Sequence, residues 1–214
     1  MRTIFTLLFI AALTLLSFPL LAFSPSQVFQ QYKLAATLEQ KESYVKAVEA
    51  LAPLYQERPD DYTVNLKLGW LSYLNKTYRN SQFHYEMAAA AAPAAIEPLL
   101  GMSLSLMAQG NWADVEQLMH RVLKLDYYNY YANLRLSIAL RNQKKYGLAE
   151  QIDRRMLANL PANLDFLLEL GANLFYQNKL DAAESVFSYI LILDFTNLTA
   201  QDFIARLKNK NGKR

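Results

Sequence analysis

The chain has 214 residues, of which 53% are hydrophobic and 19% are charged, and it contains only 6 Gly and 7 Pro. This composition excludes an intrinsically disordered chain and disfavours a fold with many turns between strands. Cysteine is absent, which excludes disulfides and thiolate metal ligands. The formal net charge of +3 arises from a basic C-terminal end that contains no acid: Arg206, Lys208, Lys210, Lys213 and Arg214.

The N-terminal segment, residues 1–22, is predicted to be a signal peptide. No charged side chain occurs from Thr3 to Tyr32, and the first part of this stretch is almost wholly apolar. Cleavage after Ala22 would place a small residue at the cut and Leu20 two residues before it. The alternative is an uncleaved membrane anchor, because about 20 apolar residues can span a bilayer core. We therefore expect export to the periplasm or cell envelope, with membrane anchoring by this segment as the alternative.

From residue 28 the sequence repeats every 34 residues without insertion, in the blocks 28–61, 62–95, 96–129, 130–163 and 164–197. The eighth position of each block is small, and the residues there are Ala35, Gly69, Ser103, Ser137 and Gly171. Position 32 is proline in three blocks, namely Pro59, Pro93 and Pro161. A small residue lets two helices approach closely, and proline ends a helix, so each block is predicted to be a helical hairpin.

This pattern resembles the tetratricopeptide repeat, whose consensus has Leu-Gly at positions seven and eight, Ala at twenty, a large residue at twenty-four and Pro at thirty-two. Leu68-Gly69 and Leu170-Gly171 match it most clearly, and the five blocks cover 170 of the 214 residues. The resemblance implies an all-α fold, a right-handed α-α superhelix of five helical hairpins. Apolar residues at helical spacing predict a capping helix over 198–208, followed by a basic tail, 209–214.

Several residues depart from this pattern. Asp153 occupies a position where a bulky side chain should be buried, so we expect looser packing there, and Pro53 should bend the second helix of the first block. Tyr127 and Phe195 replace the terminal proline. The tyrosines around that first replacement either fill the space left by the proline or form a contact ridge, and they are Tyr127, Tyr128, Tyr130 and Tyr131.

The resemblance also implies a concave binding surface, formed by the first helix of each hairpin at positions two, five, nine, twelve and thirteen. These positions lie on one stripe of a helix. The predicted partner-binding residues are Tyr32, Leu66, Trp70, Tyr73, Leu74, Leu104, Met107, Ile138, Arg141, Asn142, Phe175 and Tyr176. Aromatic residues, Met and Arg are frequent in protein interfaces, and the alternative for the leucines is packing between neighbouring helices.

The partner predicted for this surface is an apolar protein or peptide segment. Family members that clamp the C-terminal carboxylate of chaperones carry Lys and Asn where this chain has Tyr32 and Ala36. The chain therefore departs from the pattern that would hold a charged tail.

Other classes of function find little support in the sequence. The chain has only two histidines, His84 and His120, with no recognisable nucleophile, metal-ligand spacing or phosphate-binding loop, so we expect neither an enzyme nor a cofactor. The basic end is not a stripe along a groove, which argues against nucleic-acid binding. It either contacts anionic lipid at a membrane surface or complements a helix dipole.

Two functions remain from the sequence. The first is a non-catalytic interaction scaffold or adaptor of the cell envelope that binds an apolar protein segment in its groove. The alternative is a structural subunit of an envelope assembly, in outer-membrane assembly, pilus formation or secretion, whose groove is occupied within the complex.

Overall fold

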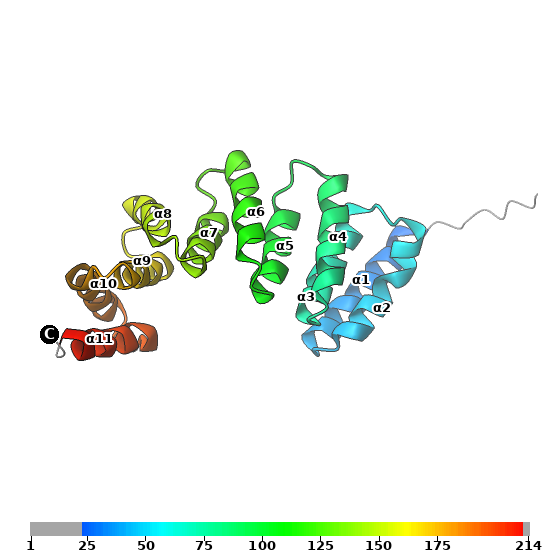
Figure 1. The fold of residues 1–214 in the computed structure, drawn as a ribbon. Helices are drawn as coiled ribbons and strands as arrows, with labels where there is room; N and C mark the ends of the chain where they lie inside the picture. Colours follow the sequence, from blue (N-terminus) through cyan, green and yellow to red (C-terminus); the bar gives the residue numbers. More distant parts are fainter. Residues whose placement is uncertain (1–22, 212–214) are drawn as a thin grey trace, which may run out of the picture.

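A computed structural model describes residues 23–211, which fold into eleven α-helices without a strand in that range (Figure 1). The helices are α1 (Pro25–Gln40), α2 (Tyr44–Glu57), α3 (Tyr62–Leu74), α4 (Tyr78–Ala91), α5 (Glu97–Ala108), α6 (Trp112–Leu125), α7 (Tyr130–Asn142), α8 (Tyr146–Asn159), α9 (Leu164–Tyr176), α10 (Leu180–Leu193) and α11 (Leu198–Asn211). The predicted signal peptide, 1–22, and the last residues of the predicted basic tail, 212–214, lie outside the described residues.

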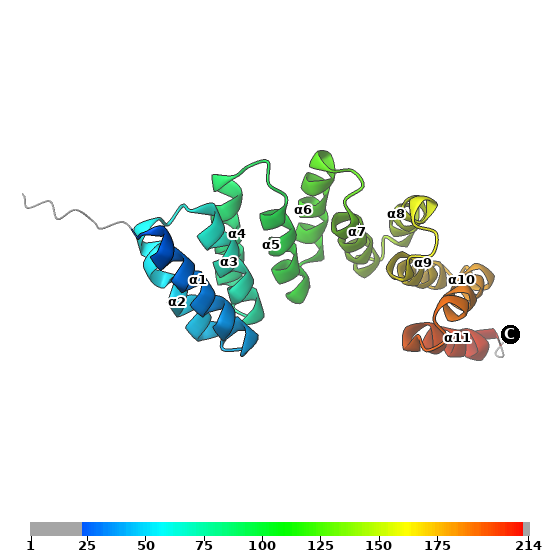
Figure 2. The same cartoon turned by 180° about the vertical axis from the view of Figure 1, so that it is seen from behind.

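Consecutive helices pack against each other as hairpins, and the hairpins stack into an arc (Figures 1 and 2). The second helices of the five hairpins begin at residues 44, 78, 112, 146 and 180, each 34 residues after the one before. The first helix begins at Pro25, three residues before the predicted first block, and α11 continues to Asn211 rather than ending at residue 208. Within residues 23–211, no helix has both the length and the apolar character needed to cross a membrane.

The turn inside each hairpin places one residue in the left-handed region of backbone conformation. These residues are Glu42, Lys76, Gly110, Lys144 and Asn178, again spaced by 34. Only glycine adopts this conformation without steric cost, and only the third hairpin has a glycine there. Asn178 also tolerates this conformation, so the geometry of the repeat overrides the local preference of the side chain at Glu42, Lys76 and Lys144.

Side-chain caps begin most of the first helices. Asp61, Asn129 and Asn163 each accept a hydrogen bond from the backbone N–H three residues later, at 2.9, 3.0 and 3.2 Å. Such caps satisfy one of the unpaired N–H groups at a helix N-terminus. These Asp and Asn residues thus separate one hairpin from the next in sequence.

The core contains large side chains of the second helices, which occupy the space left by small residues of the first helices. Tyr85 of α4 is 3% exposed and lies against Gly69 and Gly101, and Phe187 of α10 is fully buried against Gly171. The two rings are held where a methyl group on the facing glycine would collide with them. The prediction of close helix approach at Gly69 and Gly171 is confirmed.

Asp153, where looser packing was expected, is a buried side chain in the fourth hairpin. Asp153 of α8 is fully buried, and Asn173 Nδ2 of α9 donates a hydrogen bond of 2.8 Å to Asp153 Oδ2. A buried carboxyl group, hydrogen-bonded to Asn173, therefore stands where the other repeats have large apolar or aromatic side chains.

Pro53 does not end α2. The helix continues through it to Glu57 and has 14 residues, the same length as α4, α6, α8 and α10.

Candidate functional site

The first helices of the hairpins form the inner side of the arc. From α3 onward, α3, α5, α7, α9 and α11 contact one another in series. In the described part of the chain, the second helices of neighbouring hairpins contact each other less than the first helices do. Helices that approach each other more closely lie on the inside of a curve, which places α3, α5, α7 and α9 on the inner side of the arc (Figures 1 and 2).

A group of three aromatic side chains lies near the middle of α3 and the start of α4. The ring centroids of Trp70 and Tyr73 are 5.7 Å apart, and those of Tyr73 and Tyr78 are 6.2 Å apart. All three side chains are half-buried. We call Trp70, Tyr73 and Tyr78 the central aromatic cluster.

Glu39 of α1 fixes one side of this cluster. Trp70 Nε1 donates a hydrogen bond of 2.6 Å to Glu39 Oε1, and the Lys67 ammonium pairs with the same carboxylate. This contact links α1 to α3 and orients the indole ring. Glu39 occupies position twelve of the first block, one of the positions of the predicted surface, but the sequence did not predict that it holds Trp70.

The aliphatic residues of the predicted surface contribute mainly to packing. Leu66 and Met107 are half-buried and pack against the apolar core. Leu74, Leu104 and Ile138 are also half-buried. Leu66 and Met107 therefore serve mainly in packing between helices, which was the alternative to partner binding. Both side chains offer only part of their surface to solvent.

Arg141 is paired within the fold. Its Nε and Nη2 donate to the two carboxylate oxygens of Glu169 in α9, at 2.7 and 3.2 Å. Burial disfavours the charged guanidinium, but Glu169 outweighs burial and leaves the pKa of Arg141 above its usual value. Asn142 is exposed, and its side chain donates to Ile138 O at 2.8 Å.

A second aromatic surface lies at the C-terminal end of the stripe. Tyr176 is 44% exposed and stacks on Tyr146, with centroids 5.3 Å apart. Phe175 is half-buried, and its ring lies 5.3 Å from Phe203 of α11. The final helix thus covers Phe175 and leaves Tyr176 accessible.

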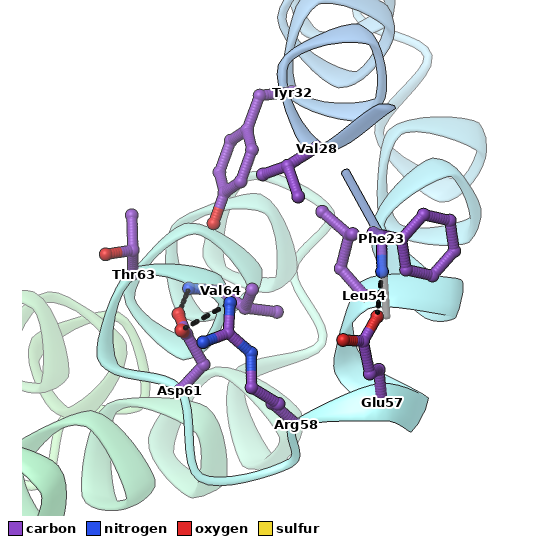
Figure 3. Close-up of a pocket in the computed structure, with 9 residues that line it drawn as sticks. All are labelled: Phe23, Val28, Tyr32, Leu54, Glu57, Arg58, Asp61, Thr63 and Val64. Atoms are coloured by element: carbon purple, nitrogen blue, oxygen red, sulfur yellow. Dashed lines mark hydrogen bonds and ion pairs between the residues drawn. The ribbon is translucent and has the colours of Figure 1, made fainter. Parts of the chain in front are cut away.

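Tyr32 does not join the other predicted residues. It lines a cavity of about 220 Å³ at the N-terminal end of the arc, together with Phe23, Leu54 and Asp61 (Figure 3). Its buried hydroxyl has no hydrogen-bond partner among the described residues. Burial raises the pKa of Tyr32 to about 12, and the nearby Asp61 carboxylate adds to this shift.

The tyrosines between the third and fourth hairpins do not fill a gap. Tyr127, Tyr128 and Tyr131 are each more than half exposed, while the Tyr130 hydroxyl donates to Asp165 at 2.6 Å. The interpretation as space-filling rings is therefore wrong for three of the four. Tyr127 and Tyr128 lie exposed on the α6–α7 connection, and Tyr131 lies exposed on the first turn of α7.

Two buried asparagines, which sequence reasoning missed, hold the start of α3 and of α7. Asn65 Nδ2 donates to Pro59 O at 2.7 Å, and Asn133 Nδ2 donates to Tyr127 O at 3.0 Å. Asn65 Oδ1 lies 2.9 Å from His84 Nδ1. Both asparagines occupy the fourth position of their blocks, and this shared position was a signal that could have identified them.

His84 is a packed side chain. Its ring contacts those of Tyr55 and Phe83, and burial lowers the pKa of His84 below its usual value. Within residues 23–211, no group of three or more His, Asp or Glu side chains is arranged to hold a metal ion.

Stacked helical hairpins with an inner face of first helices define an α-α solenoid. More specifically, the fold is that of the tetratricopeptide-repeat proteins, as the sequence predicted. No family model matches the chain, and no curated protein sequence matches it.

Several solved structures share this fold. A tetratricopeptide repeat protein from Parabacteroides merdae superposes with a TM-score of 0.80 and 16% identity, over 88% of this chain and 75% of that one. MamA from Desulfovibrio magneticus gives a TM-score of 0.67 and 17% identity, over 71% and 85%. YrrB, described as a TPR protein with an unusual peptide-binding site, gives 0.68 and 13%, over 80% and 89%.

Proposed function

We propose that this protein is a non-catalytic interaction scaffold of the cell envelope, which binds an apolar segment of a partner protein along its inner face. The observation that carries this proposal is the pair of aromatic surfaces on that face, the central aromatic cluster and the stacked Tyr146 and Tyr176. Tyrosine and tryptophan supply large contact area at low cost in side-chain entropy, and they are enriched at the centres of interfaces.

The internal pairing of charges favours an apolar partner. Arg141 is engaged with Glu169, and Lys67 is engaged with Glu39, so these charges on the inner face are already neutralised within the fold. A partner segment with apolar side chains could cover the rings without leaving a charge unpaired. The fold shared with YrrB, which is described as having an unusual peptide-binding site, is consistent with this use of the inner face.

The envelope location is the part of the proposal that rests on sequence. The apolar segment of residues 1–22 is typical of an export signal, and the absence of cysteine is compatible with an oxidising compartment.

Substitution of Tyr73 and Tyr176 by Ala tests the proposed surface. Truncation of two interface aromatics should weaken partner binding about 30-fold, because a loss of about 1 kcal/mol at each residue adds to about 2 kcal/mol. Tyr189→Ala is the matched control, since Tyr189 of α10 is 40% exposed and belongs to a second helix. Binding would be measured by co-purification and titration with the partner identified by crosslinking, and circular dichroism should show unchanged helix content.

Equal binding by the double variant and the control would contradict the proposed surface. The alternative function, a structural subunit, is favoured instead if the exported protein is a stable oligomer in which Tyr73 is shielded from solvent. Sedimentation of the purified protein distinguishes these two cases.

A further inference from the structure

The backbone of Phe23 is fixed against an acidic side chain. Its N–H donates a hydrogen bond of 3.1 Å to Glu57 Oε2, across a sequence separation of 34 residues (Figure 3). Phe23 also packs on the apolar cluster of the first hairpin, beside Val28 and Leu54. Ordered packing is therefore already present at the residue that follows the predicted cleavage point.

The next two residues fix the direction of the chain. Ser24 N-caps α1 and forms a capping box with Gln27, in which Gln27 Oε1 accepts from Ser24 N–H at 2.8 Å. Pro25 occupies the first turn of the helix, where its restricted backbone angle is favourable. The nitrogen of Phe23 thus has a defined position relative to α2.

A carboxylate is an unexpected choice at the position of Glu57. Glu57 is the last residue of α2, and the C-terminal end of a helix carries partial negative charge that disfavours a nearby anion. A neutral amide N–H could be satisfied equally well by a neutral acceptor. The adjacent cation, Arg58, pairs with Asp61 at 3.6 Å, and among the described residues Phe23 N–H is the hydrogen-bond donor to Glu57.

We propose that the peptide bond between Ala22 and Phe23 is the processing site, and that the new α-ammonium group of Phe23 forms an ion pair with Glu57. Hydrolysis of this bond consumes one water molecule and leaves a carboxylate on Ala22 and an ammonium on Phe23. The ammonium takes the place of the amide N–H, 3.1 Å from the carboxylate. This inference rests on the export part of the proposed function and is independent of the binding surface.

The ion pair would hold the N-terminal end of α1 against the C-terminal end of α2. In a solenoid each repeat is stabilised by its neighbours, so an end repeat opens most readily. Maturation then strengthens the hairpin that has a neighbour on only one side. The pairing also raises the pKa of the α-amino group above its ordinary value of about 7.7–8.0.

The first experiment is the mass of the mature protein, isolated from cells in which it is exported. The expected mass corresponds to a chain that begins at Phe23. An intact Met1, or a start at any other residue, overturns the inference. Binding by the Tyr73 and Tyr176 surface is measured separately, so this failure does not affect that part of the proposed function.

The second experiment tests the ion pair in the chain that begins at Phe23. Glu57→Gln should speed amide hydrogen exchange in α1 about fivefold, the size expected for a partly exposed ion pair. It should also return the α-amino pKa to its ordinary range. Glu49→Gln is the control, because Glu49 is exposed on the same helix.

The same substitution in a matched chain with Gly-Ser added before Phe23 should have little effect, because the donor is then an uncharged amide. An equal effect of Glu57→Gln in both chains, or none in either, would overturn the ion pair.

Discussion

Replacement of Asp153 by Asn is expected to stabilise the protein by about 4 kcal/mol at pH 8, and to have almost no effect at pH 4. Burial raises the pKa of the Asp153 carboxyl from 3.8 to about 7, against the opposing effects of Ser137, Asn173 and Arg141. Glu169 adds to the increase. The substituted amide keeps the shape of the side chain and its contact with Asn173 while it removes the charge.

The direction of this pH dependence follows from the pKa of Asp153 in the unfolded and folded states. In the unfolded chain Asp153 ionises near pH 3.8, whereas in the folded chain it holds its proton up to about pH 7. The folded state therefore binds more protons across this interval, and the wild-type protein loses stability as pH rises through it. The asparagine variant lacks this loss, so the difference between the two proteins grows from pH 4 to pH 7 and is constant above it.

Denaturant unfolding of both proteins at pH 4, 6 and 8 measures this difference. Asp60→Asn is the control, since Asp60 lies exposed in the turn between the first two hairpins. A pH-independent difference between wild type and the Asp153 variant would show that the buried group is not the one that titrates.

Two glycine substitutions in helices are expected to act in opposite directions. Gly101→Ala should destabilise the protein by about 2–3 kcal/mol, because a Cβ there would lie 2.3 Å from the Tyr85 ring. Tyr85 is 3% exposed and also contacts Gly69, so its ring has no free space to move into. This clash exceeds the gain in helix propensity of about 1 kcal/mol.

Gly147→Ala provides the matched case, since no atom lies within 4 Å of the added Cβ in α8. Gly147 is the second residue of α8, where helix propensity counts for less than in the interior, so this substitution should stabilise the protein by about 0.5 kcal/mol. Thermal and denaturant unfolding of the two variants measure the difference. Stabilisation by both alanines would contradict the close fit of Tyr85 against Gly101.

The fold was predictable because it depends on features that recur at a fixed spacing. Gly69 and Gly171 mark close helix approaches, and proline stands at position 32 of three blocks, as Pro59, Pro93 and Pro161. One repeat alone would be a weak signal. Five copies in phase predict a stack of hairpins, because each hairpin must bury its apolar side against a neighbour.

The site was predictable in outline and not in detail. The stripe correctly placed Trp70 and Tyr73 together, but periodicity carries no information on contacts across hairpins. The pairing of Trp70 with Glu39 and the cover that Phe203 gives to Phe175 depend on three-dimensional placement. Tyr32 shares the sequence position of Leu66, yet it lies at the free end of the stack and lines a cavity there.

Photo-crosslinking in cells tests the central claim most directly. A photoreactive amino acid would replace Tyr73 on the inner face in one strain and Tyr189 on a second helix in another. Mass spectrometry of the adducts should identify one defined, apolar segment of a partner protein at position 73 and not at position 189. Adducts of the same protein at both positions, or adducts only at position 189, would contradict a partner-binding inner face.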